Sequence, residues 1–515
     1  MSGEPHGRAD RAEGEDLAAL GDLTSDAFRR HGHAVIEWIA DYLDGVGDLP
    51  VQAQVAPGAI RYALPAAPPD RGEPFEAVLA DLDRVLLPGI THWNHPAFHA
   101  YFAITGSGPG ILAEALSAAL NVNGMLWRTS PSATELEELV LDWLRQMVGL
   151  APGWRGVLTD TASVSTLVAL AAARERAELE IRQRGMAGRP DLPHLRVYTS
   201  VDAHSSVEKA AITLGIGRDG VRLIPVDAQR RMDVDALREA IAEDVRLGSR
   251  PLAIVATVGT TSTTAVDPVD AIADVRDAAA AELDHPIWLH VDAAYGGVAA
   301  ICEELRWLLD GVDRADSFVT NPHKWLFTPL DCSALFVRDV DTLTAAFSLV
   351  PEYLTTDDEG VTDFMDWGVQ LGRRFRALKL WTVIRTFGRD GLADRLRHHV
   401  AQAQHVAAWV AGQPELELAA PVPLSTVCFR SVPAALAATD EPDPQDAADE
   451  GAREAALTIH NRSWLDAINA TGEAYLSHTV LDGRYVLRLA VGNLRTTDDR
   501  LDATLAMLER TRPTG

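Results

Sequence analysis

The sequence has little cysteine. Its 515 residues include three, Cys302, Cys332 and Cys428. An odd number at such wide spacing forms neither a zinc-binding pattern nor a disulfide framework. This usage predicts a protein of the reducing cytoplasm.

Positive charge is also scarce. The chain has 46 Lys and Arg residues against 74 Asp and Glu residues, a formal net charge of −28. Binding to a nucleic acid requires a basic face, so this balance argues against a nucleic-acid partner. A local basic pocket stays compatible with it.

Long hydrophobic runs are missing. No apolar run reaches membrane-spanning length, and the charged start MSGEPHGRADRAEGED lacks the apolar region of a signal peptide. Hydrophobic residues make up 47% and charged residues 23%, which is ordinary globular composition in a chain long enough for two or three domains. We therefore expect a soluble cytoplasmic protein without a membrane partner.

The sequence texture predicts four parts. Residues 1–20 are expected to be a disordered tail, and residues 21–107 a helical N-terminal segment. Residues 108–381 have the pattern of a large α/β domain, and residues 382–515 that of a smaller α+β domain.

The N-terminal segment contains two predicted amphipathic helices. The first begins at Asp26, an expected N-cap, and places Phe28, Val35 and Ile39 on one face. The second covers residues 75–89. Two such helices enclose little core, so they must pack on a larger body, either the rest of the chain or a second copy of it.

The large domain alternates helices with short β-branched runs: RGVLTD, LRVYTS, VRLIPVD, LAIVATV, IWLHVDAA and DSFVTN. This alternation predicts a mostly parallel sheet covered by helices on both faces. In the smaller domain, helices precede two predicted strands, STVCFRSV and YVLRLAV. The acidic stretch ATDEPDPQDAADEGARE within it is expected to be a solvated loop.

Polar residues follow five of the predicted strands. In an open α/β sheet, ligands bind beyond the carboxyl ends of the strands. The residues found there include Thr161, Ala162, Ser163, His204, Thr261, Asp292, Ala294, Asn321, His323 and Lys324. They include no Cys/His metal set, and neither GxGxxG nor a Walker lysine is present.

One small molecule suits this combination. The helix start at Ser163 fits a single phosphate, and a buried Asp292 fits a protonated ring nitrogen. Lys324 could condense with a carbonyl group, and His204 could stack on an aromatic ring. Each feature alone is common in structures without a ligand. Together at the strand ends of one sheet, they predict pyridoxal 5′-phosphate as the cofactor.

The segments HVDAAYGG, NPHKWL and DAHSSVEKA resemble the group II pyridoxal-phosphate decarboxylases, which include the aromatic-L-amino-acid, histidine and tyrosine decarboxylases. SPSATELEELVLDWL, ATVGTT, LGRRFRALKLW and HPAFHAYF also fit this family, and the resemblance runs from about Asp26 to the C-terminus. It implies fold type I, an N-terminal helical flap, a large cofactor-binding domain and a small C-terminal domain. It also implies an obligate homodimer with both active sites at the subunit interface.

The resemblance also assigns roles to residues. It implies that Lys324 binds the cofactor covalently, that Asp292 pairs with its ring nitrogen, and that His204 stacks on its ring, with Ala294 against the ring. The implied phosphate contacts are Ala162, Ser163, Asn321, His323 and, from the other subunit, Gly372. Thr261 is placed near the ring oxygen. Tyr353 lies on a loop that reaches the neighbouring site, where the family associates tyrosine with proton transfer and amine formation.

The predicted substrate pocket is mostly apolar. It consists of Tyr101, Phe102, Ile104 and Leu330, together with Asn123, Met125 and Trp127 from the other subunit. No arginine or lysine is among them to pair with an acidic side chain, which favours an L-amino acid with an aromatic or large apolar side chain. Phenylalanine, tryptophan and tyrosine are expected in that order, and a large aliphatic substrate stays open.

The predicted reaction is decarboxylation to the primary amine and carbon dioxide. The first alternative is an oxygen-using aldehyde synthase on the same scaffold. The second is an aminotransferase in which Arg488 holds the substrate carboxylate. The third is a non-catalytic, cofactor-binding regulator.

Overall fold

The computed structural model describes residues 21–349, 360–437 and 446–513, with residues 446–449 described by their backbone alone. The chain forms two compact units, which divide between His95 and Pro96. The predicted tail, residues 1–20, lies outside the described residues. The predicted domain limits at residues 107/108 and 381/382 stay predictions.

The first unit is built from helices. Both predicted helices are present: α2 (Ser25–Gly45), and α4 (Phe75–Asp81) continued by a π-helical turn (Leu82–Leu86). The prediction of Asp26 as N-cap is wrong, because the hydroxyl of Thr24 accepts the N–H of Ala27 and caps the helix. The short helices of this unit are η1 (Val46–Asp48), α3 (Ala59–Ala63) and η3 (Leu87–Gly89).

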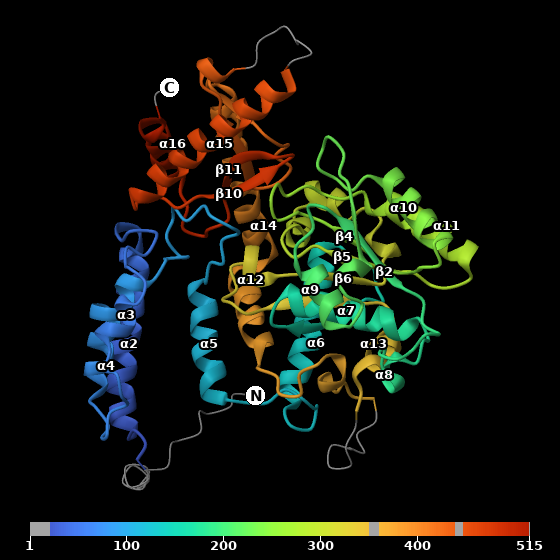
Figure 1. Cartoon of the computed structure of the whole chain (residues 1–515). Helices are drawn as coiled ribbons and strands as arrows, with labels where there is room; N and C mark the ends of the chain where they lie inside the picture. The colour runs from blue at the N-terminus through green and yellow to red at the C-terminus, as the bar shows by residue number, and fades with distance from the viewer. Residues whose placement is uncertain (1–20, 350–359, 438–445, 514–515) are drawn as a thin grey trace. The chain divides into compact units, whose positions relative to one another are not determined.

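A sheet of seven strands forms the centre of the second unit as far as the structure describes it (Figure 1). The strand order is β1-β7-β6-β5-β4-β2-β3, and β7 runs antiparallel to both its neighbours while the remaining pairs are parallel. The predicted mostly parallel sheet is therefore confirmed, but β7 was not predicted. The strands are β1 (Arg155–Thr159), β2 (Leu195–Ser200), β3 (Val221–Ile224), β4 (Arg250–Thr257), β5 (Trp288–Asp292), β6 (Ser317–Thr320) and β7 (Ser333–Val337).

Helices cover both faces of this sheet. Alternate residues of β4 show the two sides, because Ile254 and Ala256 pack into one core cluster while Ala253 and Val255 pack into the other. The first cluster includes α6 (Pro131–Val148), α10 (Val234–Arg246) and α11 (Val269–Leu283). The second includes α7 (Ala162–Arg176), α9 (Ser206–Thr213) and α13 (Val340–Phe347).

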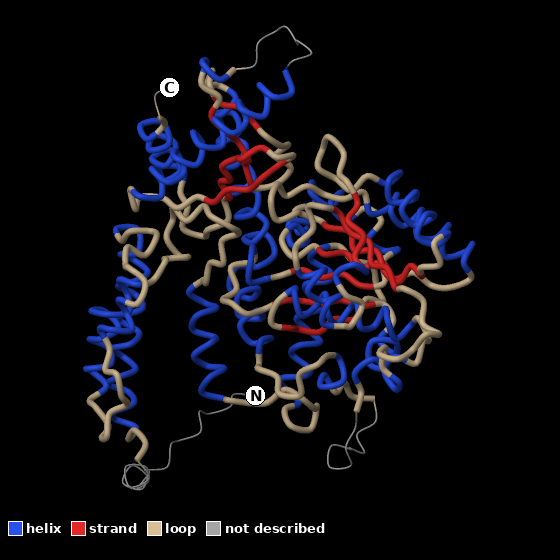
Figure 2. Tube along the Cα trace, in the orientation of Figure 1, coloured by secondary structure: helices blue, strands red, loops and turns tan. Residues whose placement is uncertain are grey.

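A second, smaller sheet lies in the C-terminal region (Figure 2). It is antiparallel in the order β10-β11-β9-β8 and consists of β8 (Leu416–Leu418), β9 (Thr426–Ser431), β10 (Ser477–Leu481) and β11 (Arg484–Ala490). Only β9 and β11 were predicted. Around it are α14 (Arg376–Ala411), which breaks at Gly388 with φ 67°, α15 (Asp446–Ala470) and α16 (Asp498–Thr511).

The loop predicted for the acidic stretch is wrong from Asp446 onward, where α15 begins; residues 438–445 lie outside the described residues. The remaining helices are short or connect the sheets. They are α5 (Gly108–Leu120), α8 (Ile181–Arg184), η4 (Arg218–Gly220), η5 (Gly296–Ile301), η6 (Glu303–Leu309), η7 (Val312–Arg314), α12 (Pro322–Trp325), η9 (Phe364–Trp367) and η10 (Ala434–Leu436).

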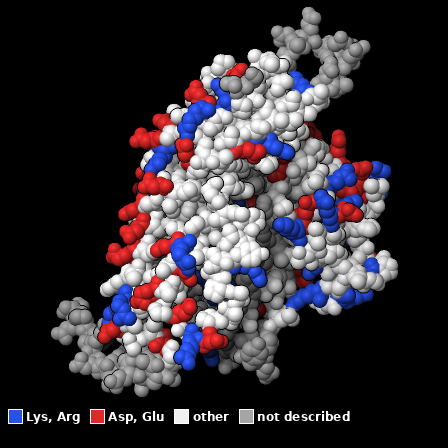
Figure 3. All heavy atoms as spheres, turned by 60° about the vertical axis from the view of Figure 1, so that its left-hand side comes forward, with Lys and Arg blue, Asp and Glu red and all other residues white. Residues whose placement is uncertain are grey.

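Charged side chains of both signs are interspersed on the face shown in Figure 3, with uncharged areas between them. Within the described ranges, no helix combines the length and apolar character that crossing a membrane requires.

Candidate active site

A cavity of about 220 Å³ lies where the parallel strands of the large sheet end. Thr257 and Asp292 end β4 and β5, and residues that follow these two strands and β1, β2 and β6 form most of the wall. The lining residues are Phe102, Ile104, Thr161, Ala162, Ser163, His204, Thr257, Gly259, Thr261, Asp292, Ala294, Tyr295, Asn321, His323, Lys324 and Leu330. The cavity thus has the position expected for a ligand site in an open α/β sheet.

The structure brings most of the predicted site residues together here. The predicted residues that line the cavity are Phe102, Ile104, Ala162, Ser163, His204, Thr261, Asp292, Ala294, Asn321, His323, Lys324 and Leu330. Tyr101, Asn123, Met125, Trp127 and Gly372 do not line it, and Tyr353 lies outside the described residues.

Lys324 sits on the short helix α12, directly after β6. Its Nζ lies 5.2 Å from the centre of the Phe102 ring. Burial lowers the pKa of the Lys324 ammonium, and the charge of Arg488 acts in the same direction, while Asp292 opposes the shift. A lowered pKa increases the fraction of uncharged amine, which is the nucleophilic form.

Asp292 is the last residue of β5, and 6% of it is exposed. Its Oδ1 accepts the N–H of Ala294 at 3.1 Å. A carboxylate at this depth requires a cation or a hydrogen-bond donor. Among the described residues of the cavity wall, the protonated form of Lys324 is such a cation, and a protonated ring nitrogen of a ligand would be a second partner.

Several polar groups of the cavity are left for a ligand. No side chain in the part of the chain that the structure describes caps the N-terminus of α7, so the first-turn N–H groups at Ala162 and Ser163 are available to an anion. Among the described residues, Asn321 Oδ1 and Thr257 Oγ1 are buried without a hydrogen-bond partner. Together with Asp292 and Lys324, these groups fit a molecule that carries a phosphate, a ring nitrogen and a carbonyl.

Two histidines of the wall are held as neutral rings. His323 Nδ1 accepts the N–H of Cys332 at 2.9 Å, and His204 Nδ1 accepts the N–H of Ser206 at 3.2 Å. Burial, with a smaller effect of Lys324, lowers the pKa of His323 to about 3. Burial also lowers the pKa of His204, against the opposing charge of Asp292. In a neutral ring that accepts a backbone N–H at Nδ1, the proton resides on Nε2.

An aromatic stack behind Lys324 was not predicted. The Tyr295 ring stacks on Phe102 at 3.7 Å and on Trp325 at 4.6 Å between ring centres. Trp325 Nε1 donates to His399 Nδ1 at 3.0 Å. The stack fixes Trp325 and with it the neighbouring Lys324. The available signal was Tyr295 itself, an aromatic residue three positions after Asp292 in HVDAAYGG.

Gly259 follows a predicted strand and lines the cavity, but no role was predicted for it. Its φ is +88°, and a Cβ at this position would meet the backbone N of Gly296 at 3.0 Å. Only glycine therefore allows the strand β4 to turn here against the segment after β5. The glycine in ATVGTT was the signal.

The predicted residues that do not line the cavity contact other residues or are exposed. Asn123 Oδ1 accepts the N–H of Arg373 at 2.9 Å, which places it beside Gly372. Trp127 Nε1 donates to Glu135 Oε1 at 2.9 Å, and Met125 packs on Leu126 and Met365. Tyr101 is 51% exposed.

Residues 57–432 match the family model of the pyridoxal-dependent decarboxylase conserved domain. The chain belongs to the pyridoxal-dependent decarboxylase family. It is therefore a carboxy-lyase whose cofactor is pyridoxal phosphate, and its sheet architecture is that of the fold type I decarboxylases. The residues of the cavity fit this cofactor, as described above.

Relatives of known activity match nearly the whole chain. Tyrosine decarboxylase 4 of Petroselinum crispum is 40% identical over 498 residues, covering 95% of this chain and 93% of the relative. A phenylacetaldehyde synthase of Arabidopsis thaliana is 39% identical over 481 residues, covering 91% and 92%. The crystal structure of Oryza sativa TDC with PLP and tryptamine has a TM-score of 0.87 at 39% identity, covering 95% of this chain and 98% of that chain.

Proposed function

We propose that this decarboxylase converts an aromatic L-amino acid to the corresponding primary amine and carbon dioxide. The observation that carries the proposal is the cavity itself, which combines Lys324 and Asp292 with an apolar wall of Phe102, Ile104 and Leu330. The names of the relatives support the substrate class, since they include a tyrosine decarboxylase and a structure holding tryptamine.

Within this proposal, the cavity residues contact different parts of the cofactor. Lys324 is the covalent attachment point and Asp292 the partner of the ring nitrogen. His204 and Ala294 contact the ring and Thr261 the ring oxygen, while the phosphate is held by Ala162, Ser163, Asn321, His323 and the partner subunit's Gly372. When bound, pyridoxal phosphate supplies an electron sink next to the bond that breaks.

The protein's own part is to hold charge and to orient groups. The Asp292 carboxylate keeps a proton on the nitrogen that faces it, because at this depth it strongly favours a cation as its partner. The Lys324 side chain can take up a proton at Nζ as the amine and release one as the ammonium. The Phe102 and Ile104 side chains exclude water from the same space, which strengthens both effects.

An acidic substrate side chain is disfavoured by the composition of the wall. Among the described residues that line the cavity, Lys324 is the one Lys or Arg. In our proposal it is engaged by the cofactor. The carbon atoms of an aromatic ring lose no hydrogen bonds against Phe102, Ile104 and Leu330, whereas a carboxylate would. We expect phenylalanine, tryptophan and tyrosine as substrates, in that order.

The aminotransferase alternative has less support. It requires Arg488 to bind the substrate carboxylate, but Arg488 is not among the lining residues. Its Nε donates to the carbonyl of Ser262 at 3.0 Å and its Nη1 to the carbonyl of Tyr101. Two of its three guanidinium nitrogens are thus engaged by backbone carbonyls, and the guanidinium carbon lies 4.7 Å from the centre of the Phe102 ring.

We also propose that the enzyme is a homodimer in the cytoplasm. The helix α5 exposes Leu112, Leu116 and Leu120, which follow one another at intervals of four residues and are 54%, 58% and 58% exposed. Such a stripe on one helix face is typical of an interface. The chain continues from this helix into Asn123, so a second copy covering α5 would also receive the 123–127 segment beside its own pocket.

The experiment is a product assay with the purified, cofactor-loaded enzyme. Phenylalanine, tryptophan, tyrosine, leucine and glutamate are supplied in parallel, and amine, aldehyde, hydrogen peroxide and ammonia are measured. The proposal expects amine from an aromatic substrate without peroxide. No turnover of any aromatic amino acid, with turnover of glutamate, contradicts it.

A second candidate is the aldehyde synthase, which the 39% identical phenylacetaldehyde synthase favours. Tyr353 decides between the two in our proposal, through proton transfer that yields the amine. Replacing Tyr353 by Phe is expected to shift the product from amine to aldehyde, with release of peroxide. An unchanged amine yield removes this role from Tyr353.

A further inference from the structure

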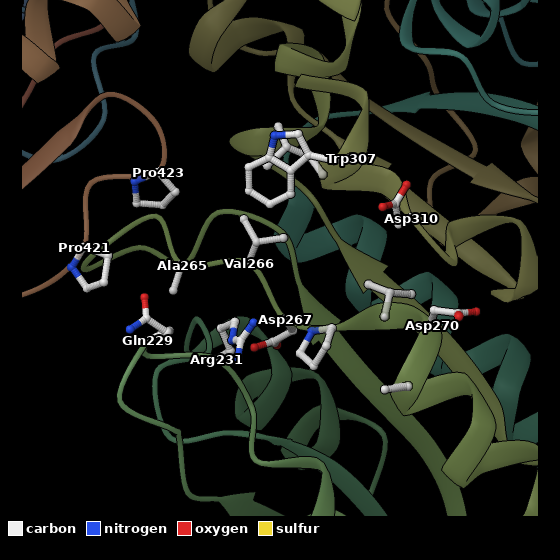
Figure 4. A pocket seen from close by; sticks show the side chains of 14 residues that line it. Gln229, Arg231, Ala265, Val266, Asp267, Asp270, Trp307, Asp310, Pro421 and Pro423 are labelled. Atoms are coloured by element: carbon white, nitrogen blue, oxygen red, sulfur yellow. The ribbon is translucent and has the colours of Figure 1, made fainter. Parts of the chain in front are cut away.

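The turn between β3 and α10 contains a buried arginine with an unusual backbone. The Asp227 N–H donates to the carbonyl of Arg231, and the Arg230 N–H to the carbonyl of Asp227. Arg230 has φ +62°, a left-handed conformation that is uncommon for a residue with a side chain. Its neighbours Gln229 and Arg231 line a separate cavity of about 480 Å³ (Figure 4). Arg230 does not line that cavity.

Arg230 instead joins two distant segments. Its Nε and Nη2 donate to the two carboxylate oxygens of Asp202 at 2.9 and 2.7 Å. Its Nη1 donates to Asp482 Oδ1 at 2.6 Å. The side chains of Arg230 and Asp202 are only 8% and 10% exposed, whereas that of Asp482 is 65% exposed. The two-pronged pair with Asp202 is the geometry that orients both partners.

The two partners of Arg230 belong to a turn at the cavity and to the smaller sheet. Asp202 lies two residues before His204, which lines the cavity, in the turn between β2 and α9. Asp482 lies in the turn of the β10–β11 hairpin. A single guanidinium therefore ties the His204 turn to the C-terminal sheet.

The same sheet also holds the loop that carries Thr261. Ser262 Oγ and Thr479 Oγ1 of β10 are 2.9 Å apart. The carbonyl of Ser262 accepts hydrogen bonds from Arg488 Nε and Cys428 Sγ at 3.0 and 3.2 Å. Two loops that line the cavity thus share one support.

The Arg230 turn is itself anchored to the end of β4. The buried carboxylate of Asp267 accepts the N–H of Met232 and the N–H of Thr257, each at 2.7 Å. Thr257 lines the cavity. The turn that carries Arg230 is therefore fixed relative to the cavity, so its guanidinium can act as a rigid clamp.

We propose that Arg230 is a positioning residue that clamps the His204 turn against the β10–β11 hairpin and so sets the position of the His204 ring at the cofactor. The clamp rests on the proposed role of His204 and is independent of which amino acid is the substrate. Loss of the clamp leaves Asp202 buried without its cation, and the His204 turn then shifts.

The test compares four variants of the cofactor-loaded enzyme. Arg230→Ala removes the clamp, Arg230→Lys keeps the charge but loses the fork, and Asp482→Ala cuts the exposed link. Arg231→Ala is the matched control, because it lies in the same turn, changes the charge equally and pairs with Asp227 instead. The readouts are kcat, melting temperature and the circular dichroism of bound pyridoxal phosphate in the visible range.

We expect Arg230→Lys to lower kcat by roughly ten-fold, since a small misplacement at an active site is costly, and to reduce the visible dichroism. Asp482→Ala is expected to do the same to a smaller extent, and Arg231→Ala to change neither. If Arg230→Ala does not fold, Arg230→Lys and Asp482→Ala decide the matter.

Two results overturn the clamp. One is wild-type dichroism and kcat in Arg230→Lys. The other is an equal loss in Arg231→Ala, which assigns the effect to the charge of the turn. The dichroism needs no substrate. An enzyme that fails to decarboxylate aromatic amino acids therefore contradicts the proposed function while leaving this test intact.

Discussion

The two units of the chain use helices in opposite ways. In the first unit, α2 has 21 residues and buries one of them, His31, while Phe28 and Ile36 are 64% and 44% exposed. In the second unit, α7 has 15 residues and buries nine of them against the sheet. An apolar helix face in the sequence therefore has one of two structural roles. It packs on a sheet of its own unit, or its own unit leaves it exposed and it can pack on another surface.

All described residues that line the cavity belong to the second unit. The largest predicted effect concerns one of these residues. Replacing Lys324 by Ala is expected to lower decarboxylation by about a thousand-fold or more, because the covalent attachment point is lost. Turnover and borohydride trapping of the cofactor on residue 324 measure it. The exposed Lys209, replaced by Ala, is the control. An adduct that persists on another lysine contradicts the assignment.

The next prediction concerns the unpaired apolar face in the second unit itself. Replacing Leu112, Leu116 and Leu120 together by Ser is expected to dissociate the proposed dimer, since each buried leucine contributes about 1.5–3 kcal/mol. Sedimentation velocity at micromolar concentration measures the assembly. Leu139 on α6, which is 44% exposed, replaced by Ser, is the control. A triple variant that sediments like the wild type removes α5 from the interface.

Acid should affect the second unit through four buried histidines. Burial lowers the pKa to about 3 for His323 and to about 4 for His99, His290 and His399. Above pH 6.5 these rings are neutral in both states. As the pH falls from 6.5 toward 4, the unfolded chain binds protons that the folded state does not, so stability falls.

The expected loss is about 1.4 kcal/mol per pH unit for each ring. Chemical denaturation at a series of pH values measures the slope. Replacing His399 by Gln should flatten the slope by one proton, and the same change at the exposed neighbour His398 is the control. Equal slopes in the two variants contradict the prediction.

The smallest predicted effect concerns the first unit. Replacing Thr24 by Ala removes the cap of α2 and is expected to cost about 1 kcal/mol. Because α2 buries so little, the change should stay local. Hydrogen exchange should rise in Ser25–Gly45 and stay unchanged in residues 96–513, and Thr24→Ser should restore it. Unaltered exchange in α2 contradicts the assigned cap.

Short strands were predicted well where the sequence is β-branched and poorly where it is not. RGVLTD, LAIVATV and IWLHVDAA form β1, β4 and β5. β7, with the sequence SALFV, and β8, with the sequence LEL, were missed, because they contain few or no β-branched residues. Their pairing depends on neighbours that are distant in the chain.

The site residues also differ in whether the sequence alone could place them. His204, Asp292 and Lys324 could be placed together from the sequence, since each follows a predicted strand and the ends of parallel strands meet at one edge. The stack of Phe102, Tyr295 and Trp325 could not, because it depends on how a segment far upstream of the sheet closes over the cavity.

The sequence by itself determined the layered α/β fold, the edge of the sheet where the chemistry lies and the cofactor that suits it. These follow from local periodicity and from residues adjacent to strand ends. Only the tertiary structure decided that β7 inserts antiparallel beside β6, and that Arg230 joins Asp202 to Asp482, which lies 252 residues after Arg230. The physical reason is that local preference acts over a few residues. The partner of a buried charge is chosen by the closure of the whole chain.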